Sequence, residues 1–139
     1  MSTIVKCAAK IKGRNYVKSA LDQMGYTYTE AQENEKIRTK GSYSSTSVDI
    51  RLEGHKDGSC RAIDSVGLIE DSNKEWTVTG DFYGVRDHNG QVLTSKSFTE
   101  HLFETWCRVR ATEMAYSHGF VEDSVERSND KIVLTYTQL

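Results

Sequence analysis

Residues 97–120 constrain the fold more than any other part of the chain, because they have the pattern of one long amphipathic helix. Its apolar residues recur at helical spacing and form one stripe: Phe98, Leu102, Phe103, Trp106, Val109 and Met114. The polar residues that fall largely off this stripe are Thr99, Glu104, Arg108 and Glu113. A helix of about twenty residues spans ~30 Å. Such a stripe is not stable in water, so we expect a flat apolar surface to cover it.

Both ends of this helix carry signals. Ser97-Phe98-Thr99-Glu100 has the form of a capping box, in which Ser97 accepts from a free backbone N–H and Glu100 reaches back. Gly119 followed by Phe120 is typical of a helix stop, with the glycine in the left-handed conformation.

The segments on either side of the helix have strand patterns. Residues 3–11 alternate, which predicts a half-buried strand, and residues 16–24 predict a helix with Asn15 as candidate cap and Gly25 as its end. A strand over 26–30 and a loop over 31–36 follow, and residues 37–46 fit either a weak strand or an exposed loop.

The middle of the chain, before the long helix, is rich in strands joined by short turns, and a further hairpin follows the helix. Residues 47–53 alternate with one wet face that includes Asp49, and residues 53–64 indicate a loop or hairpin end. Strands are predicted over 65–70 and 75–81, the latter continuing through 82–85 past a glycine bulge. Asn89-Gly90 predicts a tight turn, and residues 120–127 and 132–138 a last hairpin.

Together these elements predict a single α+β domain over residues 1–139. Because short turns join the strands, we expect a single mainly antiparallel sheet with two helices packed on one face.

Composition excludes several classes of function. The net charge of the 139 residues is −2, so no overall basic field favours binding to a nucleic acid polymer. No apolar run reaches the roughly 18 residues of a membrane span, and the N-terminus lacks a secretory apolar region. The three cysteines, Cys7, Cys60 and Cys107, are an odd count at wide spacing, which favours free thiols in a reducing, cytoplasmic compartment.

Residues capable of catalysis or metal binding are present but poorly grouped. The histidines at 55, 88, 101 and 118 are dispersed, and His55 with Cys60 lacks the second ligand pair of a zinc site, so we expect no metal and no cofactor. Cys107 lies beside the apolar stripe, where core packing explains it better than nucleophilic catalysis. We therefore expect no enzymatic activity and no catalytic residues.

A basic segment lies between the predicted strands. Thr39-Lys40-Gly41-Ser42 resembles the end of a phosphate-binding loop, but the upstream glycine and the preceding buried strand are missing. The side chains of this segment could still meet an anionic ligand or an acidic partner: Lys36, Arg38, Lys40 and Tyr43. The alternative is a solvent-exposed strand face.

The most unusual feature is aromatic. Phe82 and Tyr83, between Asp81 and Gly84, cannot both face the core of a regular strand, so one ring should be exposed or lie in a groove. Core packing and a recognition surface are both open interpretations.

Residues 77–85, with Asp81-Phe82-Tyr83-Gly84-Val85, resemble the Asp-Trp-Trp-Gly-Val segment of the hypothetical chloroplast reading frame thirty-five family. The spacing of Phe98, Trp106 and Gly119-Phe120 is similar to that family's Phe…Tyr…Gly-Phe pattern. The resemblance covers most of the chain in order, although the paired tryptophans are Phe82 and Tyr83 here. It implies a domain of unknown function with no established activity, found in cyanobacteria, plastids, other bacteria and some phages. Some members are encoded near AAA-type ATPases, which hints at an accessory role through protein contact.

The leading hypothesis is therefore a small non-enzymatic binding or regulatory protein that acts through a protein partner or homo-oligomerisation. Its candidate surface combines residues 81–84 (Asp81, Phe82, Tyr83 and Gly84) with the basic segment 36–43. The alternative is a phage-type inhibitor or sponge for a small anionic ligand such as a nucleotide, with Arg38, Lys40, Tyr43 and Arg61 lining the site.

Overall fold

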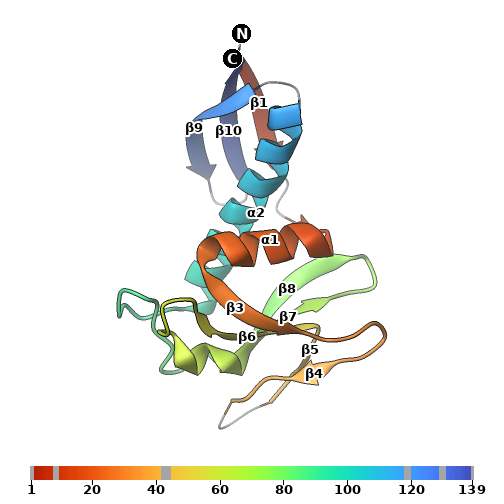
Figure 1. Ribbon diagram of the computed structural model, residues 1–139, viewed down its shortest axis with the longest axis vertical. Coiled ribbons are helices and arrows are strands. Elements are labelled where there is room, and N and C mark those ends of the chain that lie inside the picture. Colours follow the sequence, from red (N-terminus) through yellow and green to blue (C-terminus); the bar gives the residue numbers. More distant parts are fainter. Residues whose placement is uncertain (1, 8–9, 42–44, 118–119, 129–130, 139) are drawn as a thin grey trace.

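The computed structural model describes residues 2–7, 10–41, 45–117, 120–128 and 131–138. The elements in chain order are β1 (Ser2–Cys7), β2 (Ile11–Lys12), α1 (Arg14–Met24), β3 (Tyr26–Glu30), β4 (Ile37–Arg38), β5 (Ser47–Val48), β6 (Ile50–His55), the 3-10 helix η1 (Arg61–Ser65), β7 (Val66–Glu70), β8 (Glu75–Gly80), α2 (Ser95–Ser117), β9 (Phe120–Ser128) and β10 (Lys131–Gln138) (Figure 1). The predicted α+β class, with an antiparallel main sheet and helices packed against it, is confirmed.

The main sheet has five strands in the order β2-β8-β7-β6-β3, and each neighbouring pair is antiparallel. Helix α1 follows β2 and crosses α2 above this sheet (Figure 1). The strands are divided among three sheets rather than joined in one. A second sheet has the order β1-β10-β9, and β4 with β5 forms a two-residue ladder in which Ile37 faces Val48.

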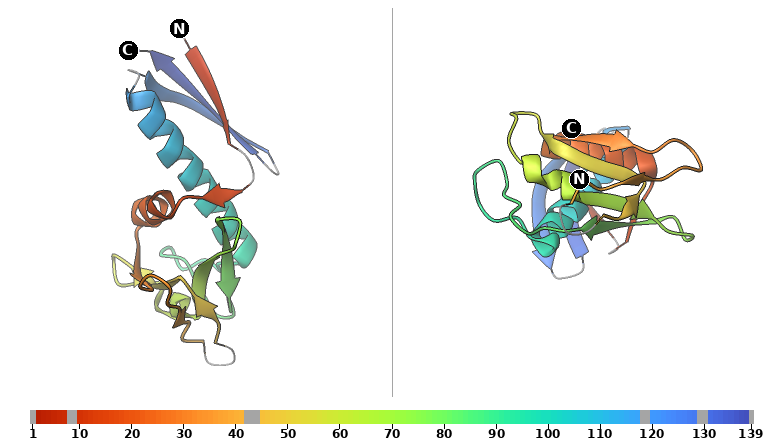
Figure 2. Two further views of the ribbon diagram at one scale, coloured as in Figure 1. Left: turned by 90° about the vertical axis from the view of Figure 1, so that its right-hand side faces the viewer. Right: turned by 90° about the horizontal axis from the view of Figure 1, so that it is seen from below.

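Helix α2 joins the two larger sheets. Its first half lies beside the main sheet and its second half beside β9 and β10, so the molecule is elongated along the helix (Figure 2). Both termini lie at the far end of the second sheet, where Ser2 of β1 faces Thr137 of β10 (Figure 1). In the described part of the chain, no helix combines the length and the apolarity that crossing a membrane requires.

The caps of the helices differ partly from expectation. Gly25 ends α1 in the left-handed conformation, as predicted, but Gly13 occupies the N-cap position and Asn15 lies exposed inside the helix. Helix α2 begins at Ser95 because Thr94 forms the capping box. The Ser97 amide donates to Thr94 Oγ1 (3.1 Å), and the Thr94 amide donates to Ser97 Oγ (3.0 Å). The predicted box of Ser97 with Glu100 is therefore wrong by one turn.

Helix α2 is described as far as Ser117. The predicted helix stop at Gly119 lies outside the described residues, and Phe120 is the first residue of β9.

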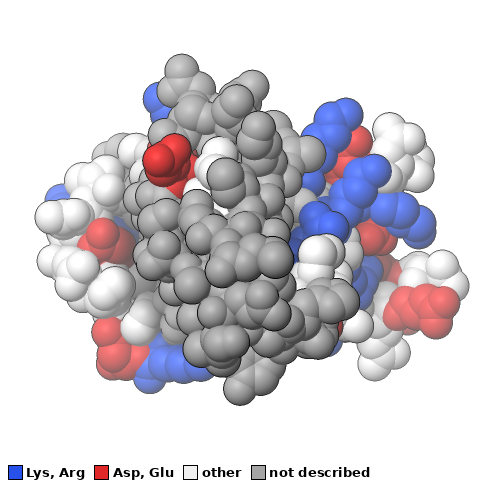
Figure 3. Space-filling view, turned by 90° about the horizontal axis from the view of Figure 1, so that it is seen from above, with Lys and Arg blue, Asp and Glu red and all other residues white. Residues whose placement is uncertain are grey.

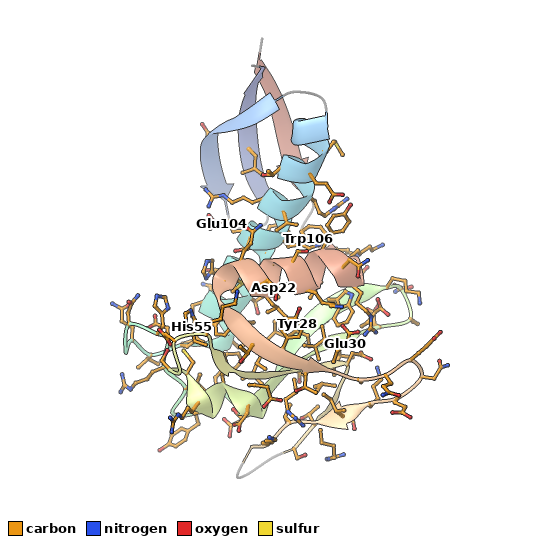
Figure 4. The ribbon with its side chains drawn as sticks, in the orientation of Figure 1. Asp22, Tyr28, Glu30, His55, Glu104 and Trp106 are labelled. Atoms are coloured by element: carbon orange, nitrogen blue, oxygen red, sulfur yellow. The ribbon has the colours of Figure 1, made fainter. Side chains whose placement is uncertain are left out.

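The apolar stripe of α2 supplies much of the core. Phe98, Leu102 and Trp106 are each 1% exposed, and the Trp106 indole N–H donates to the backbone oxygen of Lys12 (2.8 Å). This bond fixes α2 where it crosses the entry to α1 (Figure 4). Phe103 and Val109 are half-buried, whereas Met114 is 59% exposed, so its assignment to the stripe was wrong.

Two predicted strands are interrupted. The strand expected over 3–11 is divided between β1, which pairs with β10, and β2, which pairs with β8. The strand expected over 47–53 breaks at Asp49, which is buried rather than on a wet face. Asp49 accepts from Lys36 Nζ (2.6 Å) and from the Glu70 amide (2.8 Å), so the carboxylate has partners inside the fold.

The segment expected to be a loop over 53–64 contains the end of β6 and most of η1. The predicted continuation of β8 through residues 82–85 is also wrong. The strand ends at Gly80, whose φ of +128° turns the chain, and where an added Cβ would lie 2.2 Å from the backbone oxygen of Ser65.

Candidate functional site

Residues 81–84 form a compact turn that projects one aromatic side chain. The Tyr83 amide donates to Asp81 Oδ1 (2.9 Å), and the Val85 amide donates to the Phe82 oxygen (3.1 Å). Gly84 adopts a φ of +75°, which suits the third position of the β-turn over residues 82–85 that the second of these bonds closes. The Tyr83 side chain is 85% exposed, whereas Phe82 is half-buried. One ring is therefore exposed, as expected, although the segment is a turn and not the regular strand on which that expectation was based.

The base of this turn is held by the core and by η1. The Phe82 ring packs against Phe98 with centroids 6.1 Å apart. The Asp81 amide donates to the backbone oxygen of Ser65 (3.1 Å), and the Ser65 hydroxyl donates to the backbone oxygen of Asp81. The turn is therefore anchored on both sides, and Tyr83 extends from a fixed base.

A shallow groove adjoins Tyr83. Residues 82–86 and 92–95 line it, and its volume is about 550 Å³. The Leu93 amide donates to the Val85 oxygen (3.0 Å), which holds the two lining segments together. Val92 is 65% exposed, so it and Tyr83 form an exposed apolar pair around this groove.

The predicted cations of the basic segment are engaged within the protein. Arg38 Nε donates to Ser45 Oγ (2.9 Å), and Nη2 donates to the Ser45 oxygen (2.8 Å). Lys40 Nζ lies 3.7 Å from Glu53 Oε2. Tyr43 lies outside the described residues. Arg61, at the start of η1, is exposed and has no ion-pair partner in the described part of the chain.

Glu53 collects several of the donors in this region. Arg51 Nε (2.7 Å) and Thr29 Oγ1 (2.8 Å) both donate to Glu53 Oε1. Although burial raises the pKa of Glu53, these hydrogen bonds and the charges of Arg51 and Lys40 leave it below its usual value. Lys40, with a side chain that is 54% exposed, thus lies at the edge of an ionic network centred on Glu53.

Helix η1 brings the predicted segments together. The Lys40 amide donates to the Asp64 oxygen (2.8 Å), and the Asp81 amide donates to the neighbouring Ser65 oxygen. The basic segment and the aromatic turn, far apart in the sequence, therefore contact adjacent residues of one short helix. Arg61 begins that same helix. Sequence reasoning named these residues without predicting that η1 would join them.

A second group of functional side chains was not predicted. The rings of His55 and His88 are stacked, with centroids 4.8 Å apart and planes at 16°. Tyr26 meets His55 edge to face at 5.9 Å, and Asp57 Oδ1 lies 3.1 Å from His55 Nδ1. His55 ends β6 beside the first helix (Figure 4). No sequence signal identifies the stack, because His55 ends β6 and His88 lies in the segment between β8 and α2, far apart in the sequence.

Electrostatics in this histidine group favour the neutral forms of Tyr26 and Cys60 and the charged form of Asp57. Burial, followed by the charges of Cys60 and Asp87, raises the pKa of Tyr26 to about 12. Burial likewise raises the pKa of the Cys60 thiol, which disfavours the thiolate that a nucleophile requires. Hydrogen bonds from Ser59 lower the pKa of Asp57.

A related tyrosine lies on β3 under α1. Burial, followed by the nearby Asp22 carboxylate, raises the pKa of Tyr28 to about 12 (Figure 4).

Within the described residues, no three His, Cys, Asp or Glu side chains are placed to hold a metal ion. Cys107 is fully buried. These positions leave the turn at 81–84 as the candidate site that offers the most exposed recognition chemistry.

Charged side chains of both signs are mixed on the face seen along α2 from the second sheet (Figure 3). Several cations near α1 are paired: Lys10 with Glu75 (3.2 Å), Lys18 with Glu30 (3.1 Å) and Arg14 with Glu30 (3.8 Å). Their charges are therefore partly neutralised where they lie.

Comparison of the chain with models of protein families, with curated proteins and with solved structures finds no match. The family resemblance inferred from the sequence therefore stays a prediction.

Proposed function

We propose that this chain is a non-enzymatic binding protein that acts through contact with a partner protein or a second copy of itself. The contact surface is the turn at residues 81–84 with the adjoining groove. The observation that carries this proposal is the 85% exposed Tyr83 side chain on a turn fixed by its own hydrogen bonds.

The chemistry of Tyr83 suits such a role. A tyrosine ring supplies a large apolar area with one polar atom, and tyrosine is enriched among the residues that dominate binding energy at protein interfaces. Because Asp81 and Phe82 anchor the turn, little further ordering would be needed on binding. Val92, 65% exposed beside the same groove, adds apolar surface.

The nucleotide alternative has weaker support. Arg38 donates to Ser45, and Lys40 lies next to Glu53, so two of its cations would have to leave internal partners to meet an anion. A thermal-shift screen against nucleotides tests this alternative, since any ligand that binds the folded state raises the unfolding temperature.

The experiment for the proposal compares Tyr83→Ala with Gln23→Ala, an exposed position on α1 away from the turn. Sedimentation velocity measures self-association of both variants and the unsubstituted chain. A photoreactive phenylalanine analogue at position 83 or 23, in cells that make the protein, measures contact with other proteins.

We expect either self-association that Tyr83→Ala abolishes and Gln23→Ala preserves, or a crosslinked protein from position 83 and not from 23. Untagged protein should compete for that crosslink, and its Tyr83→Ala variant should not. Equal behaviour of the two positions in both assays would refute the proposal, and stabilisation by a nucleotide that Arg61→Ala abolishes would replace it.

A further inference from the structure

Strand β8 extends further than the strand on its outer side. β2 pairs with it at two positions, Ile11 with Trp76 and Lys12 with Glu75, whereas β7 pairs along β8 as far as Gly80. In the described part of the chain, no strand pairs with residues 77–79 on the β2 side. An unpaired edge offers backbone donors and acceptors to another strand.

Residues 77–79 of this edge carry none of the usual protection against pairing, although Lys10 lies nearby and is held by an ion pair with Glu75. Edge strands are commonly blocked by a lysine, a proline or a bulge. Residues 77–79 are Thr77, Val78 and Thr79, and their pairing with β7 is regular.

A groove of about 690 Å³ runs along the same edge. Its lining residues are Lys10, Ile11, Glu75, Trp76, Thr77, Val78, Ser95, Lys96, Thr99, Glu100 and Phe103. Four of them are consecutive in β8. Because successive side chains of a strand point to opposite faces, a groove that touches all four follows the strand's edge. The first turns of α2 form the opposite wall.

The lining indicates the chemistry of an occupant. Its charges cancel, since Lys10 Nζ lies 3.2 Å from Glu75 and Lys96 Nζ lies 4.0 Å from Glu100. Trp76, Val78 and Phe103 supply apolar surface between these pairs. The indole N–H of Trp76 is itself buried and has no acceptor in the described residues, so it is the ring of Trp76 that lines the groove.

We infer that this groove binds an extended, uncharged peptide segment of a partner protein, which adds a strand to the part of β8 beside α2 that pairs with no described strand on that side. Main-chain hydrogen bonds to residues 77–79 would supply affinity, and alternate apolar side chains would contact Phe103 and Val78. The surface is separate from the turn at 81–84, although Ser95 lines both grooves. Tyr83→Ala therefore tests the proposed function without testing this inference.

The test is a selection of displayed random peptides on the unsubstituted protein, followed by affinity measurements on synthetic copies of the enriched peptides. Thr99→Trp fills the groove from an exposed helix position, and His101→Trp adds the same bulk to α2 outside the groove. Lys96→Trp, at an exposed position that lines this groove and not the one beside Tyr83, is the second groove-filling variant, used if Thr99→Trp fails to fold. Amide hydrogen exchange of the complex reports which strand the peptide covers.

We expect uncharged peptides rich in β-branched residues. Their affinity should fall at least about tenfold in Thr99→Trp and stay unchanged in His101→Trp, and exchange of the amides at 77–79 should slow. The inference is overturned if no peptide is enriched, if the groove-filling variants bind the peptides as well as the unsubstituted chain, or if protection falls outside β8.

Discussion

The buried carboxylate of Asp49 gives an asymmetric prediction about stability. Its side chain is 7% exposed, whereas that of its partner Lys36 is 48% exposed, and the two are 2.6 Å apart. A half-exposed lysine contributes about 0.5–1 kcal/mol to such a pair, because water can replace much of the interaction. Lys36→Ala should therefore destabilise the fold by no more than about 1 kcal/mol.

Replacing the other partner should cost more. Asp49 Oδ2 accepts the Glu70 amide (2.8 Å), and Asp49→Ala leaves that N–H without its acceptor. An unsatisfied backbone donor costs about 1–3 kcal/mol, so with the lost pair we expect a total of about 2–4 kcal/mol. Asp49→Asn keeps one oxygen for the Glu70 amide, but it loses the charge and places an NH2 donor where Oδ1 accepted from Lys36. Because the half-exposed Lys36 can turn toward water, the cost should stay close to that of Lys36→Ala.

Urea unfolding of the three variants and of the Lys36/Asp49 double variant measures these differences. Lys40→Ala is the control, because its ion pair with Glu53 is longer, at 3.7 Å, and its side chain is 54% exposed. The reasoning fails if Lys36→Ala costs as much as Asp49→Ala, or if Asp49→Asn is as damaging as Asp49→Ala.

Two further predictions concern single positions. The raised pKa of Tyr26, about 12 in the fold against 10 when unfolded, means that its neutral form is favoured by folding, so the associated stability is full below pH 10 and is lost as pH rises toward 12. Between pH 10 and 12, ionisation of Tyr26 should lower the free energy of unfolding by about 2–3 kcal/mol in the unsubstituted chain, and Tyr26→Phe should not show this loss. Free energies of unfolding measured against pH for both proteins test this, and the same pH dependence in both would contradict it. Gly80→Ala should cost about 3 kcal/mol or more, because an added Cβ lies 2.2 Å from the Ser65 oxygen. Gly58→Ala, with φ +87° and no atom within 4 Å, should cost only about 1 kcal/mol in thermal unfolding, and equal losses would show that the contact at Gly80 is unimportant.

Local patterns predicted the parts of the fold that depend on local chemistry. The periodicity of Phe98, Leu102 and Trp106 identified α2 and its buried face, and Gly25 marked the end of α1. The misplaced start of α2 has a local cause too. Thr94 and Ser97 form one possible box and Ser97 and Glu100 another, and only the geometry decides between them.

Errors arose where distant residues determine the environment. Asp49 occupies a polar position in an alternating strand, so its pattern indicates a wet face. It is buried because Lys36 and the Glu70 amide, both remote in sequence, satisfy its oxygens. The division between β1 and β2 is similar, because alternation is the same on both sides of the break and does not specify which strand pairs with each part.

The sequence predicted some residues of the candidate site, but not which of them the fold brings together. The sequence indicates that Phe82 and Tyr83 cannot both be buried, but which ring is exposed depends on the contact of Phe82 with Phe98. Nothing in the basic segment shows that Arg38 and Lys40 find internal partners. The stack of His55 on His88 requires the end of β6 to meet the segment between β8 and α2, which no spacing rule predicts.

One half of α2 packs on the main sheet and the other half on β9 and β10. The number of residues in α2 therefore sets how far one sheet is rotated relative to the other about the helix axis. Each helical residue advances ~1.5 Å and rotates ~100°, so inserting one residue mid-helix would swing the terminal sheet by roughly a quarter turn about the axis. Inserting seven would nearly restore its facing, offset by about 20°, and would separate the sheets by a further ~10 Å. The fold should therefore tolerate an insertion of seven residues in this helix better than an insertion of one.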